Sequence, residues 1–266
     1  MPLIRVDSID DERVAVYRDL PRGHLTRESG LFIAEGRLLV ERLLASLYRT
    51  HSLLIDERRV SLLPENLADV PVFVAASELV DEIIGFNFHR GVLACGYRRS
   101  SPTLRSLPDR LGETALVLAC VDVQDRTNLG SILRNCAAFG VAAVLLSRQC
   151  ADPFARRVIR VSMGAALRLQ IIESKDIADD LAELRADSGF ELVATVLEGG
   201  ERLESAPTAA RTALMIGSEA HGLSDKVIDL ADRRVTIPMS METDSLNAAV
   251  ASGVFLYHFT RVAKLA

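Results

Sequence analysis

Five polar side chains stand at three separated places in the chain where their chemistry could be combined. They are Asn128, Arg134, Glu219, Ser245 and Asn247. Ser245 and Asn247 open a closing segment whose apolar residues cover almost every face of a helix, which is typical of a buried helix. Buried polar side chains need hydrogen-bond partners. An N-cap role explains Ser245 or Asp244 but leaves Asn247, one turn into the helix, unexplained, so we expect a binding site at this helix start.

Glu219 lies in a glycine-rich turn, GSEAHGLS, at residues 217–224. Gly217 and Gly222 allow tight turns and a close approach of the backbone to a ligand. His221 in the same turn could titrate near neutrality, although a lone histidine of this kind is more often structural. The turn is neither a dinucleotide-binding GxGxxG fingerprint nor a P-loop. It therefore predicts a ligand site and leaves the ligand open.

Asn128 and Arg134 belong to one expected helix. Taken alone, Asn128 is more simply a helix cap, and Gly130 beside it relieves crowding. Arg134 projects from an otherwise apolar stretch that contains Ile132 and Leu133, which favours a directed cation over an ordinary surface cation. Polar residues on tight turns thus follow three strands of one sheet. This coincidence favours a binding crevice, because ligands of parallel sheets bind beyond the carboxyl ends of the strands.

The elements that must position these residues alternate between strands and helices through the second half of the chain. Short apolar runs predict buried strands, and a glycine at position 140 ends a helix. This alternation indicates an α/β fold with a mainly parallel sheet covered on both faces. The expected strands are 115–123, 142–147, 167–173, 190–199, 212–219 and 234–239, and the expected helices are 128–140, 175–189 and the closing segment 243–259.

The first hundred residues predict a small α/β domain of their own. Leucines spaced between charges over residues 32–47 indicate an amphipathic helix, and short apolar runs at 53–55, 72–76 and 91–97 indicate strands. The stretch RRSSPTLRSLPDRLGE that follows has the composition of a linker. We expect a first domain at 1–100, a linker at 101–113 and a second domain at 114–266.

Composition places the chain among globular proteins and limits its partners. Of 266 residues, 49% are hydrophobic and 25% charged; no apolar run is long enough to span a membrane and no signal-peptide core is present, so a cytoplasmic protein is expected. The four cysteines have no CxxC spacing, so reduced core thiols are expected and no metal site. A net charge of −5 argues against non-specific coating of nucleic acid but permits local patches. Two arginine clusters, Arg98–Arg99 and Arg156–Arg157–Arg160, are as consistent with a solvated surface as with a binding patch.

Read together, the polar turns resemble the three motifs of the SpoU/TrmH family of RNA methyltransferases. The resemblance covers residues 115–266 in order and spacing, and this set of three motifs is specific to the family. The first hundred residues are similar to the small RNA-binding domain that often precedes this catalytic domain, through FIAEGRLLVE at 32–41 and HRGVLA at 89–94. The first catalytic motif is NLGSILRNCAAFG at 128–140, the second is IGSEAHGLS at 216–224, and the third combines IPM at 237–239 with SLN at 245–247.

The resemblance implies an activity, a fold and a partner. Members transfer a methyl group from S-adenosylmethionine, usually to a ribose 2′-hydroxyl of ribosomal or transfer RNA. Their catalytic domain is a SPOUT-like α/β sheet whose C-terminal segment forms a trefoil knot, which is an exception to the rule against knots. They work as homodimers. RNA is thus the expected substrate, with ribosomal RNA preferred because members acting on tRNA often lack the first domain.

The resemblance also assigns roles to individual residues. Gly217, Ile237 and Leu246 would hold the cofactor largely through backbone groups. Two departures from the family pattern are Ala220 in place of a glycine and two acids in the loop METD at 241–244. Met239, Thr195 and Leu197 would line the adenine pocket, and Asn128, Arg134, Glu219, Ser245 and Asn247 would form the reacting site.

Several alternatives remain open at this level. Arg134 would serve either as the general base or as an electrostatic anchor, and a guanidinium that stays protonated favours the anchor. The chain could instead be a non-catalytic RNA-binding factor in ribosome assembly that keeps the same fold. A small-molecule α/β enzyme with a nucleotide cofactor is a third possibility, against which the missing phosphate-binding loops count. The sequence leaves open which RNA and nucleotide are modified, and whether the target is a ribose or a base.

Overall fold

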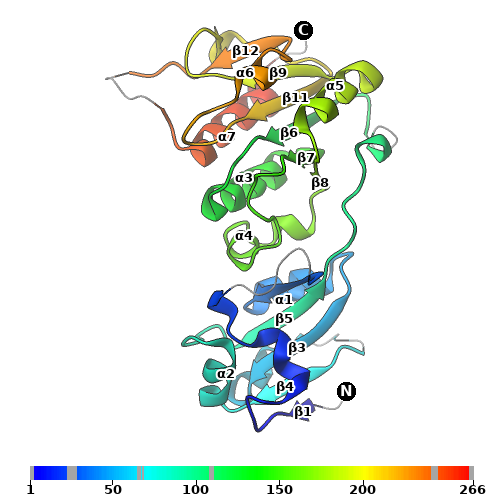
Figure 1. Cartoon of the computed structure of the whole chain (residues 1–266), viewed down its shortest axis with the longest axis vertical. Helices are drawn as coiled ribbons and strands as arrows, with labels where there is room; N and C mark the ends of the chain where they lie inside the picture. The colour runs from blue at the N-terminus through cyan, green and yellow to red at the C-terminus, as the bar shows by residue number, and fades with distance from the viewer. Residues whose placement is uncertain are drawn as a thin grey trace. The chain divides into compact units, whose positions relative to one another are not determined.

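The protein is described by a computed structural model that divides into two compact units, each described here by itself (Figure 1). The first unit comprises Met1–Ser100 and Asp152–Arg168, and the second comprises Ser101–Ala151 and Leu169–Ala266. The structure describes residues 3–22, 29–64, 67, 69–107, 111–240 and 245–263. The METD loop at 241–244, in which two acids were noted, lies outside the described residues.

The second unit is built on a seven-stranded sheet in the order β10-β12-β9-β11-β6-β7-β8. Every neighbouring pair is parallel, which confirms the expected parallel α/β sheet. The order places β6 inside the sheet, with later strands on either side of it, so a crevice is expected beyond the carboxyl ends of β6 and β11. The strands are β6 Ala115–Cys120, β7 Ala143–Leu146, β8 Ile171–Glu173, β9 Glu191–Thr195, β10 Glu201–Arg202, β11 Arg211–Ile216 and β12 Arg233–Thr236.

Helices cover both faces of this sheet. Leu181 and Leu184 of α5 and Val227 of α6 share one apolar core with alternate residues of β6, β7, β9 and β11. α3 and α7 pack against each other on the other face (Figure 1), where the intervening strand residues point. The helices are α3 Arg126–Phe139, α5 Ile177–Ser188, α6 Asp225–Ile228 and α7 Ala248–Tyr257, which a π turn at His258–Val262 extends, and single 3₁₀ turns occur at Leu104–Ser106 and Leu203–Ser205.

Two helix starts differ from the sequence expectation, and both bear on the site. α3 begins two residues before Asn128, because the carboxylate of Asp125 caps it by accepting from the backbone N–H groups of Thr127 and Asn128. Asn128 is therefore free of the capping role that sequence reasoning favoured for it. In α7 the cap is Asn247, whose Oδ1 accepts from Ala249 N at 2.9 Å, and the assignment of the cap to Ser245 was wrong.

The closing helix is not buried on all sides. Phe255 and Leu256 of α7 are buried against the second unit, whereas Val250, Val254 and Tyr257 are 54%, 40% and 54% exposed. The expectation of a wholly buried helix was wrong for the single chain. Its apolar composition therefore leaves one apolar face of α7 uncovered in this unit. The trefoil knot expected around this segment stays a prediction.

The first unit is a five-stranded mixed sheet in the order β1-β4-β3-β5-β2. β5 runs antiparallel to β2 and β3, and the β1–β4 and β3–β4 pairs are parallel. α1 packs into the core on one face, and α2 with the 3₁₀ helix η1 packs on the other. The strands are β1 Leu3–Arg5, β2 Leu31–Glu35, β3 Thr50–Asp56, β4 Val72–Ala75 and β5 Val92–Tyr97; the helices are α1 Arg37–Leu44, α2 Ser77–Ile84 and α4 Arg156–Val161; the 3₁₀ turns are η1 Glu12–Tyr17, η2 Leu20–Arg22, η3 Glu57–Leu62 and η6 Ala165–Leu167.

The continuous helix expected over residues 32–47 was wrong in its first turn. Residues 32–35 belong to strand β2, and Gly36, with φ 93°, breaks the chain before α1 starts at Arg37. The sequence concealed the strand because β2 is buried on both faces, so its apolar residues do not alternate with polar ones. Phe32 packs over Gly96 of β5, where a Cβ would lie 2.5 Å from the Phe32 ring.

Residues 152–168 follow β7 in sequence but pack within the first unit. Phe154 lies 5.4 Å from the Phe32 ring and 5.3 Å from the Tyr48 ring. Ile159 and Leu167 join the same core as α1. The second domain was expected as an unbroken stretch from 114 to 266, and the structure places this segment with the first unit instead. A fragment ending at residue 100 would therefore lack part of its core.

Candidate active site

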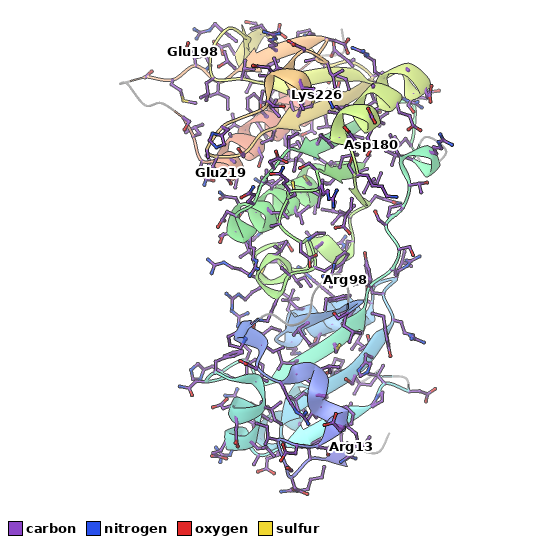
Figure 2. The ribbon with its side chains drawn as sticks, viewed as in Figure 1. Arg13, Arg98, Asp180, Glu198, Glu219 and Lys226 are labelled. Atoms are coloured by element: carbon purple, nitrogen blue, oxygen red, sulfur yellow. The ribbon has the colours of Figure 1, made fainter. Side chains whose placement is uncertain are left out.

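A cavity of about 470 Å³ lies beyond the carboxyl ends of β9, β11 and β12 and against the start of α7. This volume falls in the usual range of small-molecule sites, roughly 300–1,000 Å³. Glu198 and Glu219 lie on loops at the same side of the second unit, and both line the cavity (Figure 2). All six residues predicted to hold a cofactor also line it: Thr195, Leu197, Gly217, Ile237, Met239 and Leu246.

The turn after β11 requires glycine at position 217. A Cβ on Gly217 would stand 2.1 Å from the carbonyl carbon of Gly222, a distance at which backbone must move. The turn is closed by two backbone hydrogen bonds, from Ser218 N to Gly222 O at 3.1 Å and from Gly222 N to Ser218 O at 2.9 Å. Ala220 lies exposed at its tip, so the departure from the family glycine leaves this turn closed.

Three of the five predicted reacting residues form a continuous hydrogen-bonded chain. Asn247 Nδ2 donates to Asn128 Oδ1 at 2.9 Å, and Asn128 Nδ2 donates to a carboxylate oxygen of Glu219. Asn247 Oδ1 is occupied by the N–H groups of α7. A carboxylate at one end and backbone donors at the other thus fix the direction of both amides, because each amide has one accepting oxygen and one donating nitrogen.

The structure brings four of the five reacting residues together and leaves one apart. Ser245 lines the cavity directly with Glu219. Arg134 is exposed on α3, about 9 Å further along the helix axis than Asn128 at 1.5 Å per residue. Among the described residues, Arg134 has no ion pair, and it does not line the cavity. The single chain therefore does not place Arg134 at the reacting site.

Sequence reasoning missed Asn135, the neighbour of Arg134. Its Nδ2 donates to the backbone oxygen of Ala249 at 2.9 Å and to Ser252 Oγ at 3.0 Å. These bonds fasten the first turn of α7 to α3, and so hold Asn247 opposite Asn128. The available signal was a second polar side chain, an amide next to Arg134, in an otherwise apolar stretch of the helix.

The cysteines take no part in the site. Cys95, Cys120, Cys136 and Cys150 are free and buried, which confirms the expected reduced core thiols. Burial raises the pKa of the Cys95 thiol to about 12 and the pKa of the Cys120 thiol well above its ordinary value. Within the described residues, no group of three or more His, Cys, Asp or Glu side chains could hold a metal ion. No helix in that part of the chain is long and apolar enough to cross a membrane.

An all-parallel sheet with a cavity of this size beyond its strand ends defines an α/β domain that binds a small organic ligand. The sequence matches the model of the SpoU rRNA Methylase family over residues 115–257. The chain belongs to that family, so the expected membership is confirmed. Its similarity to RNA methyltransferases extends beyond the matched residues.

Relatives and solved structures cover nearly the whole chain. An uncharacterized tRNA/rRNA methyltransferase of Mycobacterium bovis is 38% identical over 262 residues, which are 95% of this chain and 90% of the relative. The 23S rRNA (guanosine-2'-O-)-methyltransferase RlmB of Acinetobacter baylyi is 31% identical over 214 residues, 77% of this chain and 85% of the relative. The AdoMet-bound rRNA methyltransferase from Sinorhizobium meliloti has a TM-score of 0.85 at 25% identity, covering 97% of this chain and 98% of that one.

Proposed function

We propose that the protein transfers a methyl group from S-adenosylmethionine to a ribose 2′-hydroxyl of RNA. The observation that carries the proposal is the chain of hydrogen bonds through Glu219, Asn128 and Asn247 at the edge of the cavity. These residues come from three distant segments, and the bonds hold their polar groups beside the space that the six predicted cofactor residues enclose. Membership of a family of RNA methyltransferases supports the same reaction.

The cavity fits S-adenosylmethionine in size and in lining. Gly217 lets the turn that borders the cavity close on itself, since a Cβ there would meet the backbone of Gly222, and Leu246 and Ile237 border the same space. Thr195, Leu197 and Met239 supply the wall for an adenine ring, and Thr195 is held by a 2.9 Å bond to Met215 O. The structural relative from Sinorhizobium meliloti is AdoMet-bound. When bound, the cofactor supplies a methyl group on a sulfonium centre.

The residues of the chain then position the acceptor. The 2′-hydroxyl is a poor nucleophile, so it must be held in line with the methyl group at near-attack distance. Asn128, Asn247 and Ser245 would orient the ribose by hydrogen bonds, and Glu219 holds the amide of Asn128. Because the direction of both amides is fixed in advance, little reorganisation is needed at the moment of transfer.

Arg134 would act as an electrostatic anchor for a neighbouring phosphate. A guanidinium is effectively always protonated, which makes it a poor general base. Arg134 is exposed on α3, where it is open to such a phosphate.

An apolar surface lies near Arg134. Ala137 and Ala138 of α3 are exposed, and α7, which packs beside α3, exposes Val250 and Tyr257. An uncovered apolar face of this kind marks an interaction surface, and it supports the predicted homodimer.

Ribosomal RNA is the preferred substrate class, and the cytoplasm the preferred location. The relative from Acinetobacter baylyi is a 23S rRNA methyltransferase, and the first unit supplies a separate sheet domain that could select the target.

The competing function is a non-catalytic RNA-binding factor in ribosome assembly. The intact bonding between Asn128, Glu219 and Asn247 counts against it, because such a factor has no need of oriented amides at the cavity.

Methyl transfer from radiolabelled S-adenosylmethionine to ribosomal RNA from cells lacking the protein tests the proposal. The natural chain should label the RNA, and Asn128→Ala should lower turnover by about a hundredfold, since loss of orientation has that order of effect. Asn87→Ala, at an exposed asparagine of the first unit, is the matched control and should keep full activity. RNA binding with neither label transfer nor S-adenosylmethionine binding would support the assembly factor instead.

A further inference from the structure

One carboxylate in the first unit is buried among three arginines. Glu35, the last residue of β2, is 4% exposed. Arg90 Nε lies 3.4 Å from Glu35 Oε1, and Arg156 Nη1 and Arg160 Nη1 lie 3.2 Å and 3.8 Å from Glu35 Oε2. One negative charge balances one guanidinium, so the cluster keeps an excess of positive charge. We call Glu35 with these three arginines the Glu35 cluster.

The three arginines differ in how much of each side chain is exposed and able to donate hydrogen bonds to another partner. Arg156 is the inner one: its side chain is 26% exposed and its guanidinium lies 4.6 Å from the centroid of the Phe86 ring. Arg90 and Arg160 are 52% and 37% exposed. A guanidinium has five N–H donors, and Glu35 engages one side of each. Their remaining donors are held in place by the buried carboxylate and are open to an anion.

A hollow of about 260 Å³ lies beside the two outer arginines. Arg90, Arg160 and Glu35 line it together with Gly36 and the first turn of α1. Leu38 and Met163 also border it, and they are 43% and 36% exposed. The hollow thus combines fixed cationic donors with accessible apolar surface.

Several other arginines of this unit are already matched by carboxylates. Arg37 pairs with Glu41 at 2.7 Å, and Arg58 pairs with Glu78 at 3.3 Å. Arg98, from one of the two arginine clusters of the sequence, has a side chain that is 9% exposed and pairs with Asp152, so it is not available to a phosphate. The Glu35 cluster is therefore distinguished by its surplus of cations rather than by arginine content alone.

We propose that the Glu35 cluster binds a backbone phosphate of the substrate RNA, with the adjoining nucleotide resting on Leu38 and Met163. The inference rests on the proposed function for its choice of RNA as the anion. Guanidinium forks match phosphate oxygens in geometry as well as charge. A free inorganic phosphate would use the arginines but not the apolar border. The cluster holds one phosphate and so fixes the position of the RNA on this unit, and it carries no sequence information.

The test measures the affinity of the full chain for a fluorescently labelled ribosomal RNA fragment across a range of KCl concentrations. Arg90→Gln and Arg160→Gln should each raise Kd several-fold at low salt and lower the slope of log Kd against log salt by about one. Arg90→Lys should restore most of the slope because the charge returns. Arg58→Gln is the matched control, and it should leave Kd and slope unchanged.

Two further readouts separate the possible outcomes. Arg160 lies on α4 and its ion pair with Glu35 also holds that helix, so Tm is measured for each variant. If Arg160→Gln unfolds, the test rests on Arg90→Gln, because Arg90 is half-exposed. The proposal would be overturned if the salt slope of Arg90→Gln equalled that of Arg58→Gln. It would also be overturned if added inorganic phosphate weakened RNA binding equally in the natural chain and in Arg90→Gln. If the natural chain transfers no methyl group but its RNA affinity depends on Arg90, the proposed function fails and the cluster stands.

Discussion

Replacement of Asn247 by aspartate separates the two functions of this side chain, which are to cap α7 and to orient Asn128. Asn247 Oδ1 caps α7, and Asn247 Nδ2 donates to Asn128 Oδ1 at 2.9 Å. An aspartate keeps the capping oxygen and adds a negative charge at a helix N-terminus, where it is favourable. It removes the donor and sets a carboxylate oxygen against Asn128 Oδ1. Rotating the Asn128 amide does not relieve this, since its oxygen would then face Glu219.

The magnitudes follow from these contacts. Asn247→Ala loses the cap, about 1 kcal/mol, and one exposed amide hydrogen bond, at most about 1 kcal/mol. For a chain of this size we expect Tm to fall by roughly 2–8 °C. Asn247→Asp retains the cap, so its Tm should stay within about 2 °C of the natural chain. Both variants lose the fixed orientation of Asn128, so kcat/KM should fall by about a hundredfold in each.

The assay combines thermal unfolding with initial rates of methyl transfer to RNA. Asn87→Asp, at an exposed asparagine of the first unit that does not line the cavity, controls for the added charge. Near-natural stability with lost activity in Asn247→Asp is the expected pattern. Full activity in Asn247→Asp would refute the reasoning, because the direction of the amide chain would then be irrelevant to turnover.

Three other perturbations probe the remaining parts of the account. Gly217→Ala should abolish S-adenosylmethionine binding in calorimetry, because its Cβ would meet backbone at 2.1 Å, whereas Gly112→Ala, whose Cβ would have no neighbour closer than 3.9 Å, should bind normally. Phe154→Ala should lower the free energy of unfolding of the first unit by about 3–5 kcal/mol in denaturant, although position 154 lies outside the predicted first domain. A loss below about 1 kcal/mol would contradict the packing of Phe154 in the core of the first unit. Cys95 should resist thiol reagents at pH 8 in the folded chain, since its pKa is raised to about 12 by burial and only the thiolate reacts; rapid modification without unfolding would show that the thiol is accessible.

The second unit was predictable because local sequence patterns identify its strands and helices. The buried strand β6 appears as a continuous apolar run, and Gly140, with φ 72°, ends α3 where a left-handed residue is needed. The polar turns after the strands also predicted which segments meet at the cavity, because parallel strands bring their carboxyl ends to one edge. Glu219 and Asn247, which Asn128 links through hydrogen bonds to both, were predicted in this way.

Two of the failures have a common physical cause, which is that long-range contacts overrode the local sequence pattern. β2 was hidden because burial on both faces removed the alternation that marks a strand. Residues 152–168 were assigned to the second domain by sequence continuity, yet Phe154 and Ile159 are buried against the first unit. The cap of α7 is a different case, because Asn247 Oδ1 accepts from Ala249 N within the same segment and no distant residue is involved.

The chemical position of the transferred methyl group decides whether the acceptor is a ribose or a base. RNA labelled by the natural chain with radiolabelled S-adenosylmethionine is hydrolysed in alkali, which requires a free 2′-hydroxyl next to the cleaved phosphodiester. We expect the label to remain in alkali-resistant dinucleotides, because a methylated ribose blocks cleavage at that position. Label recovered in single nucleotides, on the base, would contradict the proposed role of Asn128, Ser245 and Asn247 in orienting a ribose.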